Sequence, residues 1–183
     1  MKGTTHLVTG IGLGLILGNL FQTPYDINGE TMLGASLGAL FPDIDTGGLI
    51  ARPGKLMSVR NRNTRKIFDT TGDFISKIIQ SFTTHRGFFH WPINAIIFIV
   101  IGAFTLSPFA FYFGVGYLSH CLLDALNAKG VPLFAPISLD KYRIARLKYG
   151  GIGERIYLIL LALFILYFLK GDLMTYLEAV NYG

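Results

Sequence analysis

All four histidines of this chain lie where an apolar segment begins or ends. His6 precedes the first apolar run, and His85 and His90 precede a long uncharged one. His120 lies near the end of another, with Asp124 four residues later on the same helix face. Imidazole and carboxylate groups together suit zinc, manganese or iron. Because charged groups at apolar helix ends are costly unless they are paired or metal-bound, we expect several helix ends to meet around a metal.

Further carboxylates occupy similar positions. Pro42 ends the second apolar segment, because proline lacks an N–H and disfavours helical geometry in the residue before it. Asp43 and Asp45 follow it directly, and Glu154 opens the last apolar segment. The predicted ligands are His6, Asp43, Asp45, His85, His90, His120 and Asp124, with Glu154 as a further ligand or a general base. These eight candidates exceed one tetrahedral shell, which favours two or more ions.

The composition is that of a membrane protein. Hydrophobic residues make up 51% of the 183 residues and charged ones only 15%, which is too apolar for an ordinary soluble domain of this length. The single cysteine, Cys121, excludes an internal disulfide and fits a reduced compartment. Since Cys121 lies in an apolar segment, we expect a buried structural thiol.

Five apolar segments are predicted to be helices. Their ranges are 7–21, 31–40, 91–106, 109–127 and 154–169, and a short tail follows from Gly171. Gly-x-x-x-Gly steps in the first two allow close helix packing. The first segment has an alternative interpretation as a signal peptide, which we disfavour because no small-x-small cleavage site follows it. Residues 67–82 predict an amphipathic helix that could rest on a membrane.

The basic residues suggest an orientation for these segments. Eight of the 16 Lys and Arg residues lie in 46–90, six lie in 128–155, and Lys2 precedes the first segment. If all five segments cross a membrane, these regions share one side, which the positive-inside rule assigns to the cytoplasm. Every candidate ligand falls on that side. We therefore predict an all-α, polytopic inner-membrane bundle of about five short segments, with a basic amphipathic cytoplasmic loop, forming one domain over residues 1–183.

The order and spacing of these motifs resemble those of the YdjM-like family of membrane-bound metal-dependent hydrolases. The matching residues are His6 before a Gly-rich segment, Leu40 to Asp45, His85 to His90, Ser119 to Leu126, Gly130, Pro136 and Glu154, within residues 3–160. Phe89 and Trp91 stand where the family commonly has Thr and Ser, and Asn127 stands where it commonly has Thr. These departures leave the candidate ligands intact but remove hydroxyls that could orient them.

The resemblance implies a distant similarity to zinc-dependent phospholipase C and P1-type nucleases, and therefore hydrolysis of a phosphoester. The implied cofactor is zinc, with manganese or iron as alternatives. A bound metal would lower the pKa of a water molecule and so activate it for hydrolysis. The residues expected to act in catalysis are Glu154, Asp45 and Arg86. Arg86, Arg143 and Arg146 are expected to bind phosphate oxygens, for which the guanidinium fork is suited. The expected substrate is a phospholipid or lipid phosphate at the cytoplasmic membrane face.

Three other functions compete with hydrolysis. The same ligands could form a non-catalytic metal clasp, with the basic loops binding anionic lipid or a protein partner. A metal or proton transporter is disfavoured, because the candidate ligands gather at one interface instead of lining a path across the bilayer. Nucleic-acid binding is weaker still, because topology already accounts for the basic run from Arg60 to Lys66. The sequence specifies neither the metal nor the oligomeric state.

Overall fold

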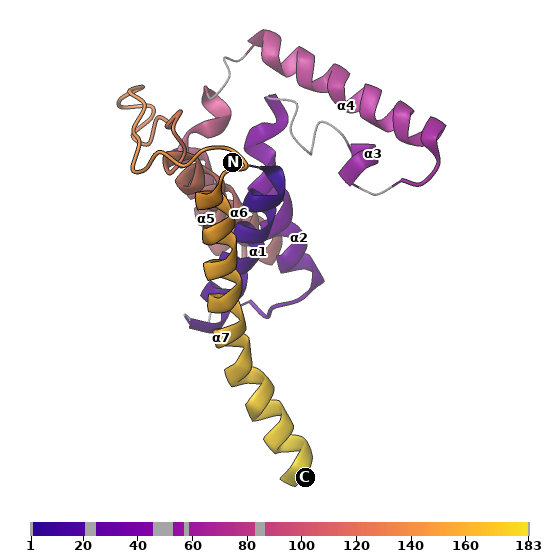
Figure 1. Ribbon diagram of the computed structural model, residues 1–183, viewed down its shortest axis with the longest axis vertical. Helices are drawn as coiled ribbons and strands as arrows, with labels where there is room; N and C mark the ends of the chain where they lie inside the picture. Colours follow the sequence, from indigo (N-terminus) through magenta and orange to yellow (C-terminus); the bar gives the residue numbers. More distant parts are fainter. Residues whose placement is uncertain (1, 21–24, 46–52, 57–58, 83–86, 183) are drawn as a thin grey trace.

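The computed structural model describes residues 2–20, 25–45, 53–56, 59–82 and 87–182, and within these ranges it contains helices but no strand (Figure 1). The elements are α1 (Gly3–Leu20), α2 (Gly29–Leu40), the 3-10 helix η1 (Phe41–Asp45), α3 (Pro53–Leu56), α4 (Arg62–Phe82), the 3-10 helix η3 (Phe88–His90), α5 (Pro92–Thr105), α6 (Pro108–Ala125) and α7 (Ile152–Tyr182). The all-α prediction is confirmed.

Helices α1, α2, α5 and α6 form a bundle, and α6 lies at its centre because it packs against all three others. Figure 1 shows α7 running alongside this bundle and projecting beyond it toward the C-terminus, while α4 extends away from the opposite end. The N-terminus, η1, η3 and the first turn of α7 gather at that same end of the bundle. One end of the structure therefore collects residues from most parts of the chain.

Local chemistry explains where the bundle helices begin. The Asn28 side chain accepts hydrogen bonds from the backbone N–H groups of Glu30 and Thr31, and the Thr31 hydroxyl accepts one from the Asn28 N–H in return. This reciprocal cap satisfies donors that the first turn of α2 leaves unpaired. Ser107 caps α6 in a similar way, with Pro108 at the first helical position. The break between α5 and α6 therefore falls where the sequence predicts it.

Small residues allow the backbones of α1, α2 and α6 to approach closely. A Cβ added at Gly38 of α2 would collide with the carbonyl oxygen of Phe113, and one added at Gly116 of α6 would collide with that of Ala35. Gly34 lies against the backbone of Phe109. The predicted role of the Gly-x-x-x-Gly step in the second segment is thus confirmed, with α6 as its partner.

One predicted helix end differs from the structure, and another agrees with it. The last helix continues to Tyr182 instead of ending near Leu169, because Gly171 costs a helix only about 1 kcal/mol and no proline follows it. At Pro42 the chain leaves α-helical geometry as predicted but continues as η1, so that Asp43 lies in a tight helical turn and not in a loop.

The sequence predicts five membrane crossings. Among the residues that the structure describes, no helix combines the length and the apolar character required to cross a membrane. Helices α2 and α5 have 12 and 14 residues. At 1.5 Å per residue they rise about 18 and 21 Å, compared with a hydrocarbon core of about 30 Å.

The close packing of α2 on α6 predicts that Gly38→Ala destabilises the protein by about 1–3 kcal/mol, because the new methyl group must displace the Phe113 backbone. The measurement is the thermal midpoint of the purified protein, which should fall by several degrees. Gly29→Ala is the matched control, since a Cβ at Gly29 meets nothing within 4 Å. Equal midpoints for the two variants would contradict this account of the packing.

Candidate metal centre

Five of the side chains predicted as metal ligands converge at the end of the bundle where the N-terminus lies. They are His6 from α1, Asp43 from η1, His90 from η3, and His120 and Asp124 from the last two turns of α6. His90 and His120 are fully buried, His6 and Asp124 are at most 2% exposed, and only the Asp43 side chain, 19% exposed, has appreciable contact with solvent. Four separate elements thus contribute to one buried polar cluster.

The distances within this cluster suit a shared ion better than direct hydrogen bonds. The Nε2 atom of His90 lies 4.0 Å from Asp43 Oδ1 and 3.7 Å from Asp124 Oδ2. His120 Nε2 lies 3.9 Å from the same two oxygens, and His6 Nε2 lies 3.6 Å from Asp124 Oδ1. These distances are longer than a hydrogen bond. Ligand atoms held about 2.0–2.2 Å from one zinc ion lie at most about 4.4 Å apart, and the five nitrogen–oxygen distances given above meet that limit.

His120 is oriented by the backbone of α2. Its Nδ1 lies 2.8 Å from the carbonyl oxygen of Ala39, which can only accept, so Nδ1 is the donor and Nε2 is directed toward the carboxylates. That Nε2 atom is buried and makes no hydrogen bond within the described part of the chain. Pro42 has no N–H to donate to Ala39 in the 3-10 turn, which leaves this carbonyl available to the histidine.

His90 is positioned by the short helix η3, whose three carbonyl groups all accept side-chain hydrogen bonds. Asn94 of α5 donates to the Phe88 carbonyl at 2.6 Å, and Tyr117 of α6 donates to the Phe89 carbonyl at 2.6 Å. The Cys121 thiol approaches the carbonyl of His90 itself at 3.7 Å. Cys121 is fully buried, as predicted. These contacts hold η3 against α5 and α6 and direct the imidazole inward.

The rings of His6 and His120 stack, with centroids 3.8 Å apart and planes 17° from parallel. Two imidazolium ions stacked at this distance would repel each other strongly in a buried site. Neutral imidazole is the form of histidine that binds metal. Within the described residues, two overlapping groups have suitable ligand atoms, namely His6 with His120 and Asp124, and Asp43 with His90 and His120.

Glu154, predicted as a ligand or a general base, belongs to neither group. Its carboxylate accepts hydrogen bonds from the backbone N–H of Lys2 at 2.7 Å, the hydroxyl of Thr5 at 2.5 Å and the backbone N–H of Gly150 at 2.6 Å. Burial by itself would raise the pKa of this carboxyl, but the three hydrogen bonds outweigh burial and hold the pKa below its usual value. Glu154 thus fastens the start of α1, which carries His6, to the start of α7.

The remaining predicted site residues lie at the edge of the cluster or beyond the described residues. His85 and Arg86 lie outside the described residues, as does the side chain of Asp45, whose backbone ends η1. Arg143 and Arg146 are exposed. Their loop is bound to the end of α6 by hydrogen bonds from the Ile144 and Leu147 N–H groups to the carbonyls of residues 125 and 126. This attachment keeps both arginines close to the helix end that carries Asp124.

Several positioning residues escaped the sequence interpretation. Asn94 and Tyr117 could have been identified from the sequence, because each is a polar group within an apolar helix about one turn from a predicted ligand. Thr5 is a weaker candidate, identified only by its position next to His6. The Ala39 carbonyl could not have been identified, because every residue has a backbone acceptor and only the packing of α2 on α6 brings this one to His120.

Comparison with known proteins agrees with the resemblance in sequence. The family model described as YdjM inner membrane protein matches residues 1–179. No curated protein and no solved structure matches the chain.

The Glu154 contacts predict a pH-dependent contribution to stability. Because the folded pKa is lowered, the contribution is complete above the ordinary glutamate pKa of about 4.3 and is lost as the pH falls through the folded pKa. Glu154→Gln removes the charge, so its thermal midpoint should be lower at neutral pH and should fall less on acidification.

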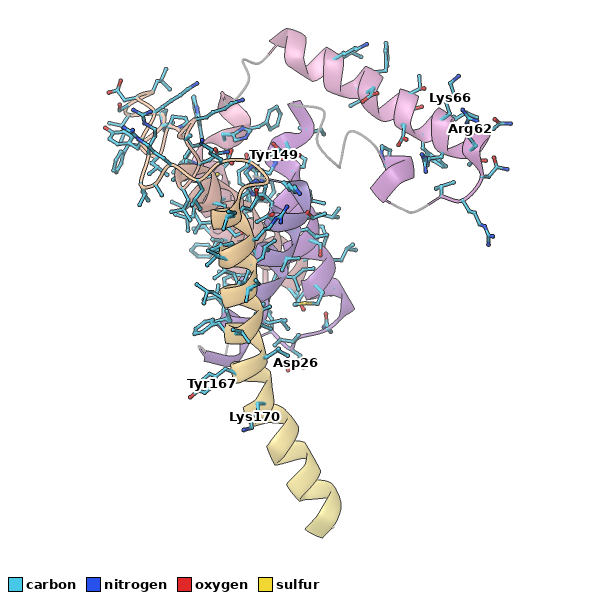
Figure 2. All side chains as sticks on the ribbon, viewed as in Figure 1. Asp26, Arg62, Lys66, Tyr149, Tyr167 and Lys170 are labelled. Carbon is cyan, nitrogen blue, oxygen red and sulfur yellow. The ribbon has the colours of Figure 1, made fainter. Side chains whose placement is uncertain are left out.

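The control for this measurement is Asp26→Asn, an exposed carboxylate at the far end of the bundle (Figure 2). Elemental analysis of the same samples distinguishes a fastening role from ligation, since Glu154→Gln should keep its metal. An unchanged midpoint, or loss of metal without loss of stability, would contradict the role assigned to Glu154.

Proposed function

The chain belongs to the YdjM inner membrane protein family, which supports an inner membrane location, and from this premise we propose that the buried His/Asp cluster is the metal centre of a hydrolase that cleaves a phosphoester. The observation that carries this proposal is the buried Nε2 of His120, which lies 3.9 Å from an oxygen of Asp43 and from one of Asp124 and makes no hydrogen bond in the described residues. A neutral imidazole and carboxylates are the donor set of catalytic zinc sites.

The positions of the donor atoms support two groups of ligands. Asp43, His90 and His120 would hold one ion, and His6 and Asp124 would contribute to a second. Because Nδ1 of His120 is engaged by Ala39, only its Nε2 is available to a metal. Zinc suits these nitrogen and oxygen donors, with manganese or iron as alternatives.

Bound metal would supply the Lewis acidity that activates water and polarises a phosphoryl oxygen. The protein groups have the other tasks. Asp43 is the most exposed member of the cluster, so substrate would approach from the η1 side. Arg143 and Arg146, held near the end of α6, would bind the remaining phosphate oxygens through their guanidinium groups. Ala39 keeps His120 in its metal-binding tautomer.

An apolar pocket beside the cluster supports a lipid substrate. Its volume is about 330 Å³, and it is lined by Phe41, Phe88, Phe89, Asn94, Ile97, Phe98 and Tyr117. The Asn94 amide and the Tyr117 hydroxyl already donate to backbone carbonyls, so the pocket offers a mainly apolar surface. It adjoins the metal centre through Phe89, the neighbour of His90. A hydrocarbon chain fits this lining, and the clustering of basic residues supports a cytoplasmic orientation of the site.

One observation favours a second function, a structural metal clasp. Four of the five ligand side chains are at most 2% exposed, which limits access for a substrate. A metal bound there would fasten α1, η1, η3 and α6 together without turning over a lipid.

Elemental analysis and lipid hydrolysis together test both functions. The purified protein should contain metal and release phosphate or a phosphorylated headgroup from mixed phospholipids. His120→Ala and Asp124→Ala should lose metal and reduce hydrolysis by about 100-fold or more, because both residues ligate the ion. Asp140→Ala, at an exposed loop position, is the control.

The outcomes separate the two functions. Bound metal without hydrolysis, combined with a lower thermal midpoint after chelation, would identify the structural clasp. A protein that binds no metal would contradict both proposals.

A further inference from the structure

Helix α4 exposes an apolar face along most of its length. Ile67, Phe68, Phe74, Ile75 and Ile78 share one side of the helix, and each is between 42% and 66% exposed. Their spacing is that of an amphipathic helix. Isolated apolar side chains on a surface are ordinary, whereas a continuous apolar face marks a binding surface.

The protein itself packs against the other side of α4. The helix contacts α3 and η1. Asp69 and Asp73 are half-buried and Gly72 is buried, while Gly54 of α3 lies against Asp69 and the backbone of Arg65. At 100° per residue these packed positions lie opposite the apolar face. Among the described residues, the contacts that hold α4 in place are on this packed side, and the apolar side chains on the other side remain exposed.

The exposed charge on and just before this helix is basic. Arg60 precedes α4, and Arg62, Arg65, Lys66 and Lys77 lie on it; all five are exposed, and with the two acidic residues on the packed side residues 60–82 carry a net charge of +3. Figure 2 shows Arg62 and Lys66 at the end of α4 remote from the bundle. An apolar face beside exposed lysines and arginines matches a surface with anionic groups above hydrocarbon.

We propose that α4 binds the surface of an anionic lipid bilayer, with its apolar face inserted at the level of the headgroups and its basic residues against lipid phosphates. A second copy of the chain is a poorer occupant, because two faces with the same positive charge would repel each other. Membership of an inner membrane protein family supports a location at such a bilayer.

Binding at α4 has a consequence for the metal centre. The helix contacts η1, which carries Asp43, the most exposed ligand of the cluster. A bilayer bound to α4 therefore lies beside the element through which substrate would enter. This consequence rests on the proposed function, whereas bilayer binding by α4 rests only on the helix itself.

Site-specific fluorescence on the full chain reconstituted in vesicles tests the proposal. Because Cys121 is fully buried, an environment-sensitive fluorophore can be attached to a new cysteine at Ile75→Cys on the apolar face. Thr70→Cys is the comparison position, which is exposed, about 140° around the helix from Ile75 and at the edge of the apolar face. With nitroxide-labelled acyl chains in vesicles of phosphatidylcholine and phosphatidylglycerol, the label at Ile75 should be quenched more strongly than the label at Thr70.

The charge requirement is tested in the same assay. Quenching at Ile75 should weaken in vesicles of phosphatidylcholine alone, at high salt, and in the double variant Lys66→Glu with Lys77→Glu. Ile67→Cys provides a second apolar-face position if Ile75→Cys folds poorly. Equal quenching at Ile75 and Thr70, or quenching that does not depend on anionic lipid, would overturn the proposal. Protection of the Ile75 label in lipid-free detergent with increasing protein concentration would instead identify a second copy of the chain as the occupant. None of these measurements requires hydrolysis. The proposal for α4 can therefore be refuted while the proposed metal centre is supported, and the metal centre can be refuted while membrane binding by α4 is supported.

Discussion

The burial of ionisable side chains is the constraint on which this structure depends. His6, His90, His120 and Asp124 are almost fully withdrawn from water, and burying such groups without compensation costs several kcal/mol each. Hydrogen bonds supply part of the compensation, most clearly where the Ala39 carbonyl accepts from His120. A cation between the facing nitrogen and oxygen atoms would supply the rest. The same distances that are too long for hydrogen bonds are suitable for ligands of one ion.

Small residues in the bundle allow the contact that orients His120. Gly38 and Gly116 let α2 and α6 approach until backbone meets backbone, and only at that separation does the His120 ring reach the Ala39 carbonyl. Pro42 contributes from the other direction, because it cannot donate a hydrogen bond in the turn that follows α2. The close packing of α2 on α6 and the missing N–H of Pro42 therefore both favour the contact between His120 and the Ala39 carbonyl.

Sequence patterns predicted the parts of this site that depend on element ends. Apolar runs and prolines mark where helices stop, so the positions of His90, His120 and Asp124 near such ends followed from local rules. The partners of Glu154 did not, because the Lys2 amide lies 152 positions away and carries no side-chain signal. The full length of α7 was also missed, because Gly171 suggested an end that helix propensity alone does not require.

The ligand residues of the cluster differ in solvent exposure, so the centre is more accessible from one side than from the other. Asp43 alone retains appreciable contact with solvent, because it lies on η1 and not within the bundle. The residues most deeply buried, His90 and His120, are fixed by contacts to backbone carbonyls, whereas η1 has α4 as a neighbour. Any ligand exchange or substrate entry would therefore involve η1 before it involved α6. Because α4 contacts η1, a bilayer bound to α4 as proposed would lie beside the accessible side of the centre and away from its buried side.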